Sequence, residues 1–373
     1  MADEEPAPPP EPAVQRSAIP RWTKWFAGLG AIVVAVGIAG TVIHLPYDTF
    51  SPGDALNLKP RVSVHGAKTY SDSGQVMLLF VRERDHVNVW SWLQAKLDSN
   101  IEMVDQTVVS GGDTQEHLNE QGVCDMTQSK ISARAAALSA LGDKVKVLPG
   151  VDIVGFPQGA TAKGVAIRFP AEKVLLPCDE IAAVDGHEVT PTTDISTLIS
   201  RHRPGTNVVL RIIRSGHPLT VKVPVAAYKG KRIIGIQPAA RYQFPVRIAV
   251  DTSNITGPSA GLAMTLAIID ELTPGDLTGG KRVAVTGTIT PGGAVGQIGA
   301  IEQKGITAKA AHAQIFIVPA CGKDAVCSAD LQKLRRRVGN NIAVEPVSTL
   351  AQALRVLRDA GGAPVRPIIR PTS

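Results

Sequence analysis

The chain has 373 residues, of which 44% are hydrophobic and 4% aromatic, with 35 glycines and 27 prolines. This length and apolar content suffice for two compact domains, or for one domain with an insertion, and the many small side chains suit an α/β protein. The formal net charge is +6 and the isoelectric point is near 9.2, but Lys and Arg are scattered. The one basic cluster, residues 335–337, has no interleaved aromatic residues. We therefore exclude nucleic acid as a partner and interpret the cluster as a solvated helix face.

The N-terminal segment predicts a membrane anchor. Residues 1–20 are acidic and proline-rich, which indicates a disordered tail. Residues 22–45 are predicted to form a single transmembrane helix, because the run from Trp25 to Leu45 has no charged residue and is long enough to span about 30 Å. The Arg and Lys residues before this run favour a cytoplasmic N-terminus and an extracytoplasmic body. A cleaved signal peptide is the alternative, although the apolar run is longer than a signal peptide requires.

Four cysteines follow the predicted anchor. Cys321 and Cys327 are close enough in sequence for a local disulfide, which an extracytoplasmic body would permit, and free buried thiols are the alternative. No Cys/His spacing resembles a zinc site, so we expect no metal and no other cofactor.

Residues 47–146 are expected to form an extracytoplasmic region that contains both strand and helix patterns. Residues 47–62 suggest an irregular lead-in with a turn at 51–53. Val76 to Val81 predicts a buried strand, and Trp90 to Leu97 a short helix. One helix is predicted to begin at Asp113, and a second to cover residues 127–141 and end at Gly142.

Residues 147–226 form a separate β-rich module. A helix is predicted over 194–201, followed by two alternating strands over 207–214 and 219–225. This order, with the turn around Leu176-Pro177-Cys178-Asp179, resembles a PDZ domain, although Cys178 stands where that family usually has glycine. The resemblance implies capture of extended peptides, including C-terminal ends, by strand addition. It places the binding segment at Val151, Val154, Gly155 and Phe156. A spacer without a ligand is the alternative.

Residues 230–360 alternate strands with helices, which predicts an α/β layer fold. The expected strands cover 247–250, 282–287 and 315–319, and the expected helices cover 258–272 and 302–313. Residues 361–373 are rich in Pro and Arg and are expected to form a disordered tail.

The sequence Gly257-Pro258-Ser259-Ala260-Gly261 places a serine where a loop turns into a helix. Free N–H groups at a helix start carry partial positive charge and can stabilise an oxyanion. We therefore assign Ser259 as a candidate nucleophile and the helix start at Gly257, Pro258, Ser259 and Ala260 as the oxyanion site. A helix start with small residues chosen for packing is the alternative.

Lys304, 45 positions later, is the candidate base. A lysine base must be neutral, so its pKa must fall from about 10.4 towards about 7–8. Apolar neighbours such as Ile298 and Ile301 can achieve this by burial. Lys309 is a rival on the same helix, and a solvent-facing lysine is the alternative for either residue.

Together these segments resemble the proteolytic domain of the Lon protease family in order and spacing. The matching segments are Gly257–Gly261, Val285-Thr286-Gly287-Thr288-Ile289-Thr290, residues 296–304, Ala310-Ala311 and Ile317-Val318-Pro319. The resemblance implies that Ser259 is the nucleophile and Lys304 the general base, and that a hexameric ring is a reasonable assembly. Many Lon proteases have an acidic residue at the position of Thr256 and Glu at the position of Thr288. These differences affect activity control and substrate positioning rather than the Ser–Lys pair.

The complete order is similar to the Lon-like PDZ-containing membrane proteins of bacteria. Residues 74–82 resemble the first strand of a Lon proteolytic domain, and residues 126–137 an early helix of it. We therefore expect an α/β (α+β) Lon-type fold, built from about 65–145 and 230–360, into which the PDZ-like module is inserted. The alternative is a PDZ-like module that follows a discrete membrane-proximal domain.

Residues 275–282 nearly match a phosphate-binding loop, but Arg282 replaces the Ser or Thr that would bind Mg²⁺, and the segment precedes a strand. We therefore predict a membrane-anchored, ATP-independent serine endopeptidase that acts on unfolded or flexible protein segments. A PDZ-based membrane scaffold or chaperone with an inactive protease-like fold is the main alternative, and a self-cleaving regulator is a second.

Overall fold

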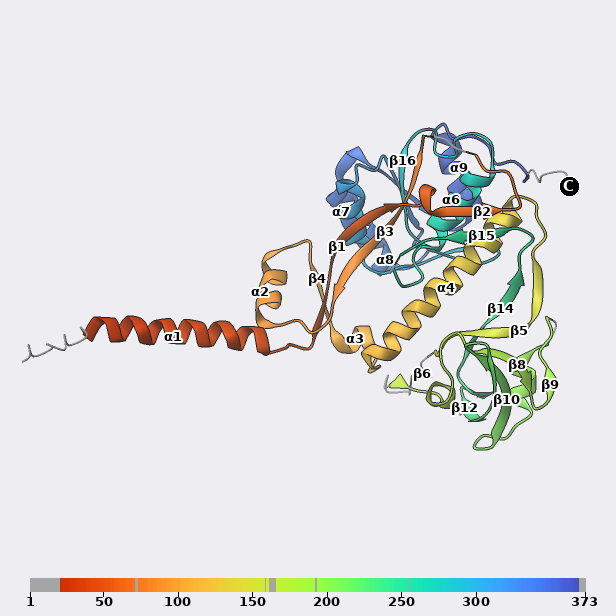
Figure 1. Cartoon of the computed structure of the whole chain (residues 1–373), viewed down its shortest axis with the longest axis horizontal. Coiled ribbons are helices and arrows are strands. Elements are labelled where there is room, and N and C mark those ends of the chain that lie inside the picture. The colour runs from red at the N-terminus through yellow and green to blue at the C-terminus, as the bar shows by residue number, and fades with distance from the viewer. Residues whose placement is uncertain are drawn as a thin grey trace, which may run out of the picture.

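The computed structural model describes residues 21–70, 73–157, 159–160, 166–191, 193–253 and 255–368. Two bodies, each built around its own sheet, lie beside each other, and helix α1 (Arg21–Val42) projects away from both (Figure 1). The tail predicted over residues 1–20 lies outside the described residues.

The first body contains a six-stranded sheet with the order β20-β19-β16-β3-β1-β4. Strands β3, β16, β19 and β20 are parallel, whereas β1 pairs antiparallel with both β3 and β4. The bounds are β1 Tyr47–Asn57, β3 Gln75–Arg84, β4 Glu102–Asp105, β16 Arg282–Val285, β19 Ile315–Pro319 and β20 Ala343–Val347. Strands that precede and follow the β-rich module in sequence therefore share one sheet.

Helices cover both faces of this sheet, which explains why its parallel strands are apolar at consecutive positions. On β3, Val76 and Leu78 belong to one apolar cluster, with α4, α6 and α9, while Met77 and Leu79 belong to a second, with α7 and α8. The bounds are α4 Gln115–Ala140, α6 Gly261–Leu272, α7 Ile301–Ala310, α8 Ala325–Val338 and α9 Leu350–Asp359.

The second body is an antiparallel sheet with the order β11-β10-β8-β5-β14, to which β9 adds beside β8. Its separate core includes the fully buried Ile153, Ile181, Leu210 and Ile212. The bounds are β5 Lys146–Gly155, β8 Glu180–Val184, β9 His187–Glu188, α5 Ile195–Ser200, β10 Asn207–Arg214, β11 His217–Pro224 and β14 Gln237–Gln243. Helix α4 runs between the two bodies (Figure 1).

Short elements complete the described chain. The helices among them are α2 Val89–Leu97 and α3 Gln106–Ser110, with short 3-10 turns at Lys59–Arg61, Pro170–Lys173 and Gly339–Asn341. The paired strands are β2 Val62–His65 with β15 Arg247–Val250, β6 Gly159–Ala160 with β7 Ala166–Ile167, β12 Ala226–Tyr228 with β13 Lys231–Ile233, and β17 Thr288–Ile289 with β18 Val295–Gly296.

Two predictions about residues 47–146 are wrong. Residues 47–57 are not an irregular lead-in, because β1 finds partners on both sides, and Pro52 and Gly53 lie at a break in its register with β3. The helices predicted from Asp113 and over 127–141 are one continuous helix, α4, which Thr114 caps and which Gly122 does not interrupt.

The predicted disorder from residue 361 is wrong for residues 361–368. The N–H of Ala363 donates to the carbonyl of Asp276 at 2.8 Å, and Val365 and Ile368 pack against the first core. This segment therefore belongs to the folded body, and residues 369–373 lie outside the described residues.

Among the helices that the structure describes, none is at once long and apolar enough to cross a membrane. The transmembrane helix predicted over residues 22–45 is therefore not supported by the structure.

All four cysteines are paired. Of the two alternatives for Cys321 and Cys327, the structure shows the disulfide. A second disulfide, which the sequence analysis did not foresee, joins Cys124 on α4 to Cys178 in the β-rich module, 54 residues away in sequence.

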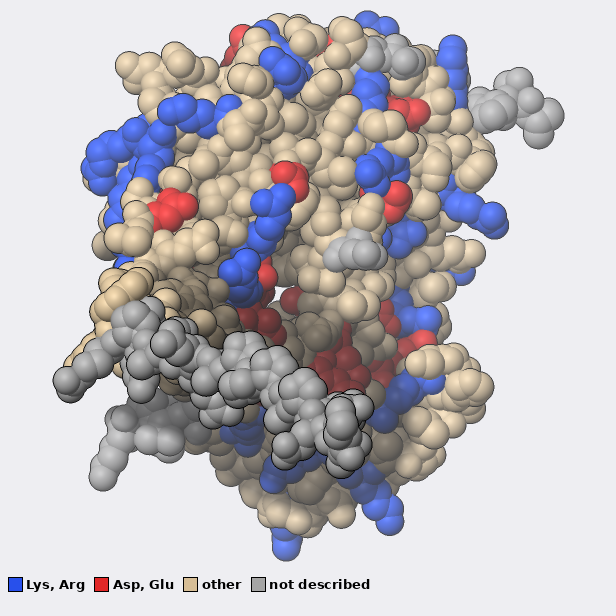
Figure 2. Space-filling view, turned by 60° about the vertical axis from the view of Figure 1, so that its left-hand side comes forward, with Lys and Arg blue, Asp and Glu red and all other residues tan. Residues whose placement is uncertain are grey.

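Charged side chains are distributed unevenly. Figure 2 shows Lys and Arg in several separate groups over the outer surface, and Asp and Glu lining a hollow near the centre of this face. The surplus of positive charge is thus not gathered into one patch on this side of the molecule.

Candidate active site

The candidate nucleophile lies in the loop between β15 and α6. Gly257 has φ +92°, a conformation that favours glycine, and the half-buried Ser259 follows two residues later. Helix α6 begins at Gly261 with Ala260 as its N-cap, so the predicted start at Pro258 is three residues too early.

Three hydrogen bonds from remote segments fix this loop. The N–H of Gly257 donates to the carbonyl of Gly122 on α4 at 2.9 Å, and the Ser129 hydroxyl, also on α4, donates to the carbonyl of Pro258 at 3.2 Å. The N–H of Gly287, just after β16, donates to the carbonyl of Ser259 at 3.0 Å. The position of Ser259 therefore depends on both α4 and the central sheet.

The candidate base comes from helix α7. Lys304 lies in α7 and is 4% exposed, and its Nζ donates to Thr286 Oγ1 at 3.3 Å. Burial lowers the pKa of Lys304 to about 8, because desolvation disfavours the charged ammonium. The Thr286 hydroxyl also lies 3.5 Å from the carbonyl oxygen of Ser259, so Thr286 connects the base to the nucleophile loop.

Ser259 and Lys304 line one cavity of about 370 Å³. Most of its other side chains are apolar, and several come from the edge strand β4 and from the neighbouring strands β1 and β3. The remaining lining residues are Phe50, Val81, Glu102, Val104, Pro258, Gln297, Ile298, Gly299 and Ala300. An apolar cavity beside a nucleophile can accept a substrate side chain and excludes water from the base.

Two of the four predicted oxyanion residues cannot donate. The N–H of Gly257 already bonds to Gly122, and Pro258 has no N–H. The N–H groups of Ser259 and Ala260 have no acceptor among the described residues, so these two are the remaining donors of the predicted set.

The rival base is not in the cavity. Lys309 is exposed, and its Nζ donates to the carbonyl of Arg337 at 3.3 Å. The structure thus separates two lysines of one helix: Lys304 is buried and lines the cavity that Ser259 also lines, and Lys309 is at the surface.

Three residues that support the site were not among the predicted site residues: Gly122, Ser129 and Thr286. Thr286 could have been found, because it lies in the Thr-Gly pair that carries the resemblance to Lon proteases. Gly122 had no such signal. Ser129 lies in the segment 126–137 that resembles an early helix of the Lon proteolytic domain, but only the packing of α4 brings either residue to the loop.

The predicted peptide-binding segment lies mostly within strand β5 and stays a prediction. Strand β5 pairs with β14 along one side and with β8 and residues 178–179 along the other, so it has no free edge for strand addition. Val154, Gly155 and Phe156 instead line a cavity of about 290 Å³ against α4, and Val151 is paired within the sheet. Among the described strands, β14 is the edge strand on this side.

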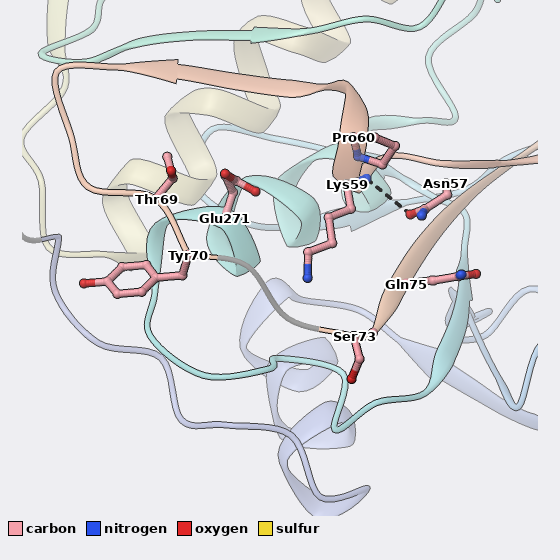
Figure 3. Close-up of a pocket in the computed structure, with 9 residues that line it drawn as sticks. Asn57, Lys59, Pro60, Thr69, Tyr70, Ser73, Gln75 and Glu271 are labelled. Carbon is pink, nitrogen blue, oxygen red and sulfur yellow. Dashed lines mark hydrogen bonds between the residues drawn. The ribbon is translucent and has the colours of Figure 1, made fainter.

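Two other features lack the chemistry of a catalytic site. A cavity of about 540 Å³ is lined by Ser73 and Lys59 among others (Figure 3), but Ser73 Oγ donates to Asp276 Oδ2 at 3.4 Å and Lys59 Nζ lies 3.8 Å from Asp270 Oδ2, so each group interacts with a carboxylate. In the segment that resembles a phosphate loop, the Asp276 carboxylate accepts from the N–H groups of Thr278 and Gly280, each at 2.9 Å. A protein carboxylate therefore occupies the donors that a phosphate would need.

One side-chain cluster has metal-ligand chemistry. Ligand atoms of Asp113, His117 and Glu172 lie within 4.8 Å of one another. The Arg168 guanidinium donates to both carboxylates, with 2.9 Å to Glu172. This position is filled by a cation of the protein itself, and we assign no metal to it.

Comparison with known proteins gives matches to two families. Residues 231–359 match the family described as the Lon protease (S16) C-terminal proteolytic domain, and residues 140–225 match the PDZ domain family. The chain is 28% identical over 255 residues to a Lon protease of Roseiflexus castenholzii, covering 65% of this chain and 30% of that relative. It is 32% identical over 98 residues to a Lon protease of Neorickettsia sennetsu, covering 26% and 11%.

A solved PDZ domain of an SdrC-like protein from Listeria monocytogenes is 21% identical, with a TM-score of 0.19, over 24% of this chain and 86% of that one. The chain spans less than a third of the length of the Lon relatives named above. The two family matches cover different parts of the chain: residues 231–359 resemble the Lon proteolytic domain family, and residues 140–225 resemble the PDZ family.

Proposed function

We propose that this protein is a serine endopeptidase in which Ser259 is the nucleophile and Lys304 the general base. The observation that supports this most directly is that both side chains line one apolar cavity, with Lys304 buried and its pKa lowered to about 8. A lysine in this state is neutral often enough near neutral pH to accept a proton.

The reaction would proceed in two halves. Ser259 Oγ attacks the scissile carbonyl while its proton passes to Lys304 Nζ, and the N–H groups of Ser259 and Ala260 stabilise the oxyanion. Lys304 then gives this proton to the leaving amine as the C–N bond breaks, which leaves an acyl-serine. A water molecule, deprotonated by Lys304, attacks the acyl group, and Lys304 returns the proton to Ser259.

The substrates we propose are unfolded or flexible protein segments, cleaved without ATP. The PDZ domain would supply binding together with β14, which follows the PDZ match in sequence but completes the same sheet. A peptide would add to the free edge of β14, with its carboxylate end held by backbone N–H groups. A hexameric ring is a further proposal, carried over from the resemblance to Lon proteases, and analytical ultracentrifugation tests it.

Hydrolysis of casein by the full-length protein in detergent, without ATP, tests the proposal. We expect wild type to cleave, and Ser259→Ala and Lys304→Ala to lose at least about 10³-fold in kcat. Lys309→Ala is the matched control, because this lysine lies on the same helix outside the cavity. Unchanged cleavage by Ser259→Ala would overturn the proposal and favour a PDZ-based scaffold or chaperone.

We also propose that the protein is attached to a membrane, with its N-terminus cytoplasmic and its catalytic body outside the cytoplasm. Apolar side chains are exposed along α1, including Trp25 (81%) and Ile32 (62%), and such surfaces mark interaction sites. The two disulfides fit an oxidising compartment. Two separate experiments test this proposal: carbonate extraction of isolated membranes tests the attachment, and protease treatment of intact cells tests on which side the body lies. Release into the supernatant, or protection of the body in intact cells, would contradict it.

A further inference from the structure

We propose that Gly122 and Ser129 of α4 are positioning residues for Ser259, and that the PDZ domain holds them in place through the Cys124–Cys178 disulfide. This inference rests on the proposed function, because it concerns the loop that carries the nucleophile. It concerns a connection between the two domains that neither family match describes, since Cys124 precedes both matched regions.

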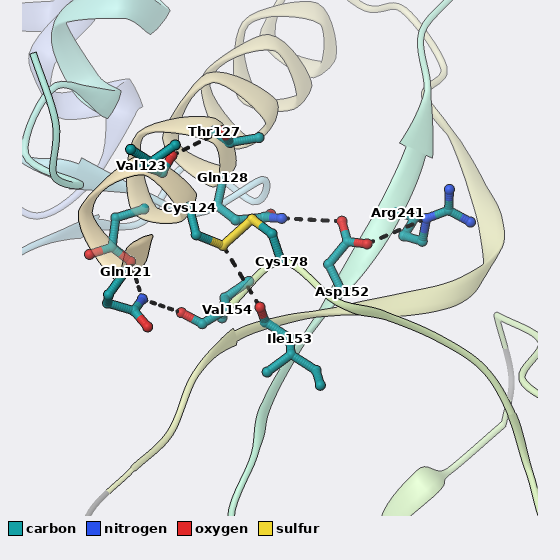
Figure 4. Close-up of a disulfide and its surroundings, with 11 residues drawn as sticks. Gln121, Val123, Cys124, Thr127, Gln128, Asp152, Ile153, Val154, Cys178 and Arg241 are labelled. Atoms are coloured by element: carbon teal, nitrogen blue, oxygen red, sulfur yellow. Dashed lines mark hydrogen bonds and ion pairs between the residues drawn. A yellow bond between two sulfur atoms is a disulfide. The ribbon is translucent and has the colours of Figure 1, made fainter. Parts of the chain in front are cut away.

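The PDZ domain is attached to α4 near the middle of the helix by a disulfide and hydrogen bonds (Figure 4). Cys124 is bonded to Cys178, and one turn on either side two glutamines extend the contact to β5. Gln121 Nε2 donates to the carbonyl of Val154 at 2.8 Å, and Gln128 Nε2 donates to Asp152 Oδ2 at 3.1 Å. These bonds fix both the position of α4 along its axis and its rotation about that axis, relative to the PDZ sheet.

The position of the first half of α4 depends on these contacts with the PDZ domain. Every buried residue of the helix lies at or beyond Cys124, so residues 115–123 have no buried side chain to anchor them in the first body. Their contacts include the Gln121 bond and the packing of the His117 ring against Phe156, with 6.0 Å between ring centroids. Gly122 further weakens this half, because glycine in a helix interior costs about 1 kcal/mol relative to alanine.

The same short stretch of helix holds the nucleophile loop. Gly122, two residues before Cys124, provides the carbonyl that accepts from Gly257 at 2.9 Å. Ser129, five residues after Cys124, donates to the carbonyl of Pro258 at 3.2 Å. The PDZ domain and the Ser259 loop are thus attached to α4 within two turns of each other, and a shift of one reaches the other through a rigid element.

The backbone at Cys178 supports a specific role for the disulfide. Cys178 has φ +64°, which costs a residue with a side chain about 1–2 kcal/mol and which glycine would adopt freely. Such a conformation persists only where the surroundings impose it. Here the side chain that causes the cost is the one that reaches Cys124.

Hydrogen exchange of the full-length protein, with and without a reducing agent, tests the connection without requiring catalysis. After reduction we expect amides of residues 115–124 to exchange about tenfold faster, amides of the loop around 255–262 to follow, and those of β16 and β19 to stay unchanged. Cys124→Ser/Cys178→Ser should show the faster exchange already and no longer respond to reductant. Cys321→Ser/Cys327→Ser is the matched control and should respond as wild type does.

Kinetics on a short peptide that cannot reach the PDZ domain tests the positioning role. Reduction of wild type and the Ser129→Ala change should each lower kcat about five- to tenfold, while the pH midpoint of the reaction, which reports Lys304, stays in place. If helix residues 115–124 loosen but the 255–262 loop does not, or if neither responds, the connection is overturned. If wild type does not cleave at all, the proposed function fails, whereas hydrogen exchange still decides this inference.

Discussion

The two residues of the candidate catalytic pair, Ser259 and Lys304, owe their properties to different parts of the fold. Ser259 lies in a half-buried loop whose position is set by hydrogen bonds from α4 and from Gly287. Lys304 lies on a helix, 4% exposed, and its basicity is set by desolvation. Hydrogen bonds thus fix the candidate nucleophile, whereas desolvation tunes the candidate base, so substitutions around the two should have different effects on activity.

The largest effect is expected from Lys304→Arg, which keeps the charge and removes the base. The guanidinium stays protonated over the whole working pH range, so arginine cannot accept a proton from Ser259 near neutral pH. We expect kcat to fall at least about 10³-fold, as for Lys304→Ala, in a casein or peptide assay. Lys309→Arg is the control and should retain activity, and an active Lys304→Arg enzyme would show that the charge, not proton transfer, is needed.

The pH dependence should follow the base. Burial lowers the pKa of Lys304 to about 8, so the ammonium form dominates below this pH and cannot act as the base. We expect kcat/KM to rise about 50-fold from pH 6 to pH 8 and to level off above pH 9. A flat profile over this range, measured with the protein shown to stay folded, would contradict Lys304 as the base.

Thr286→Val tests the contact through which Thr286 connects Lys304 to the Ser259 loop. Valine keeps the shape but loses the hydroxyl, which accepts from Lys304 Nζ at 3.3 Å and lies beside the Ser259 carbonyl. We expect kcat to fall about tenfold. The midpoint of the pH profile should move to lower pH, because a hydrogen bond that favours the charged ammonium is lost.

A rise of the midpoint in Thr286→Val would contradict this arrangement. Thr290→Val is a matched control, because Thr290 lies in the same segment and its hydroxyl accepts from the N–H of Ala294, outside the cavity lining. It should leave the midpoint unchanged.

The sequence predicted the strongly patterned elements well. The strand over 315–319 is confirmed to the residue, and the helix predicted over 194–201 is α5, one residue shorter at each end. These segments have periodic apolar positions and clear turn or cap residues, which act locally. Strand β1 was missed because Pro52 and Gly53 interrupt its pattern, and only pairing with β3 and β4 makes it a strand.

The site residues also divide into those that the sequence predicts and those that only the structure reveals. Ser259 and Lys304 lie in recognisable segments, and the structure brings them to one cavity. The contributions of Gly122 and Ser129, and the Cys124–Cys178 bond, arise from packing between segments that are distant in sequence. No local pattern encodes such contacts, and cysteine spacing alone cannot give the pairing.

The smallest effect tests how strictly the nucleophile loop must be held. Gly257 has φ +92°, and an added Cβ would meet no atom within 4 Å, so Gly257→Ala adds backbone strain without a clash. We expect a loss of about 1–2 kcal/mol in the free energy of unfolding and a drop of a few-fold in kcat. The Lys304 pH midpoint should stay unchanged, because the environment of the base is intact. Gly292→Ala is the control, since its backbone is outside the left-handed region and has room for the methyl group. If Gly257→Ala lost stability but kept full kcat, the loop would tolerate displacement, and geometry would no longer distinguish the nucleophile from the base.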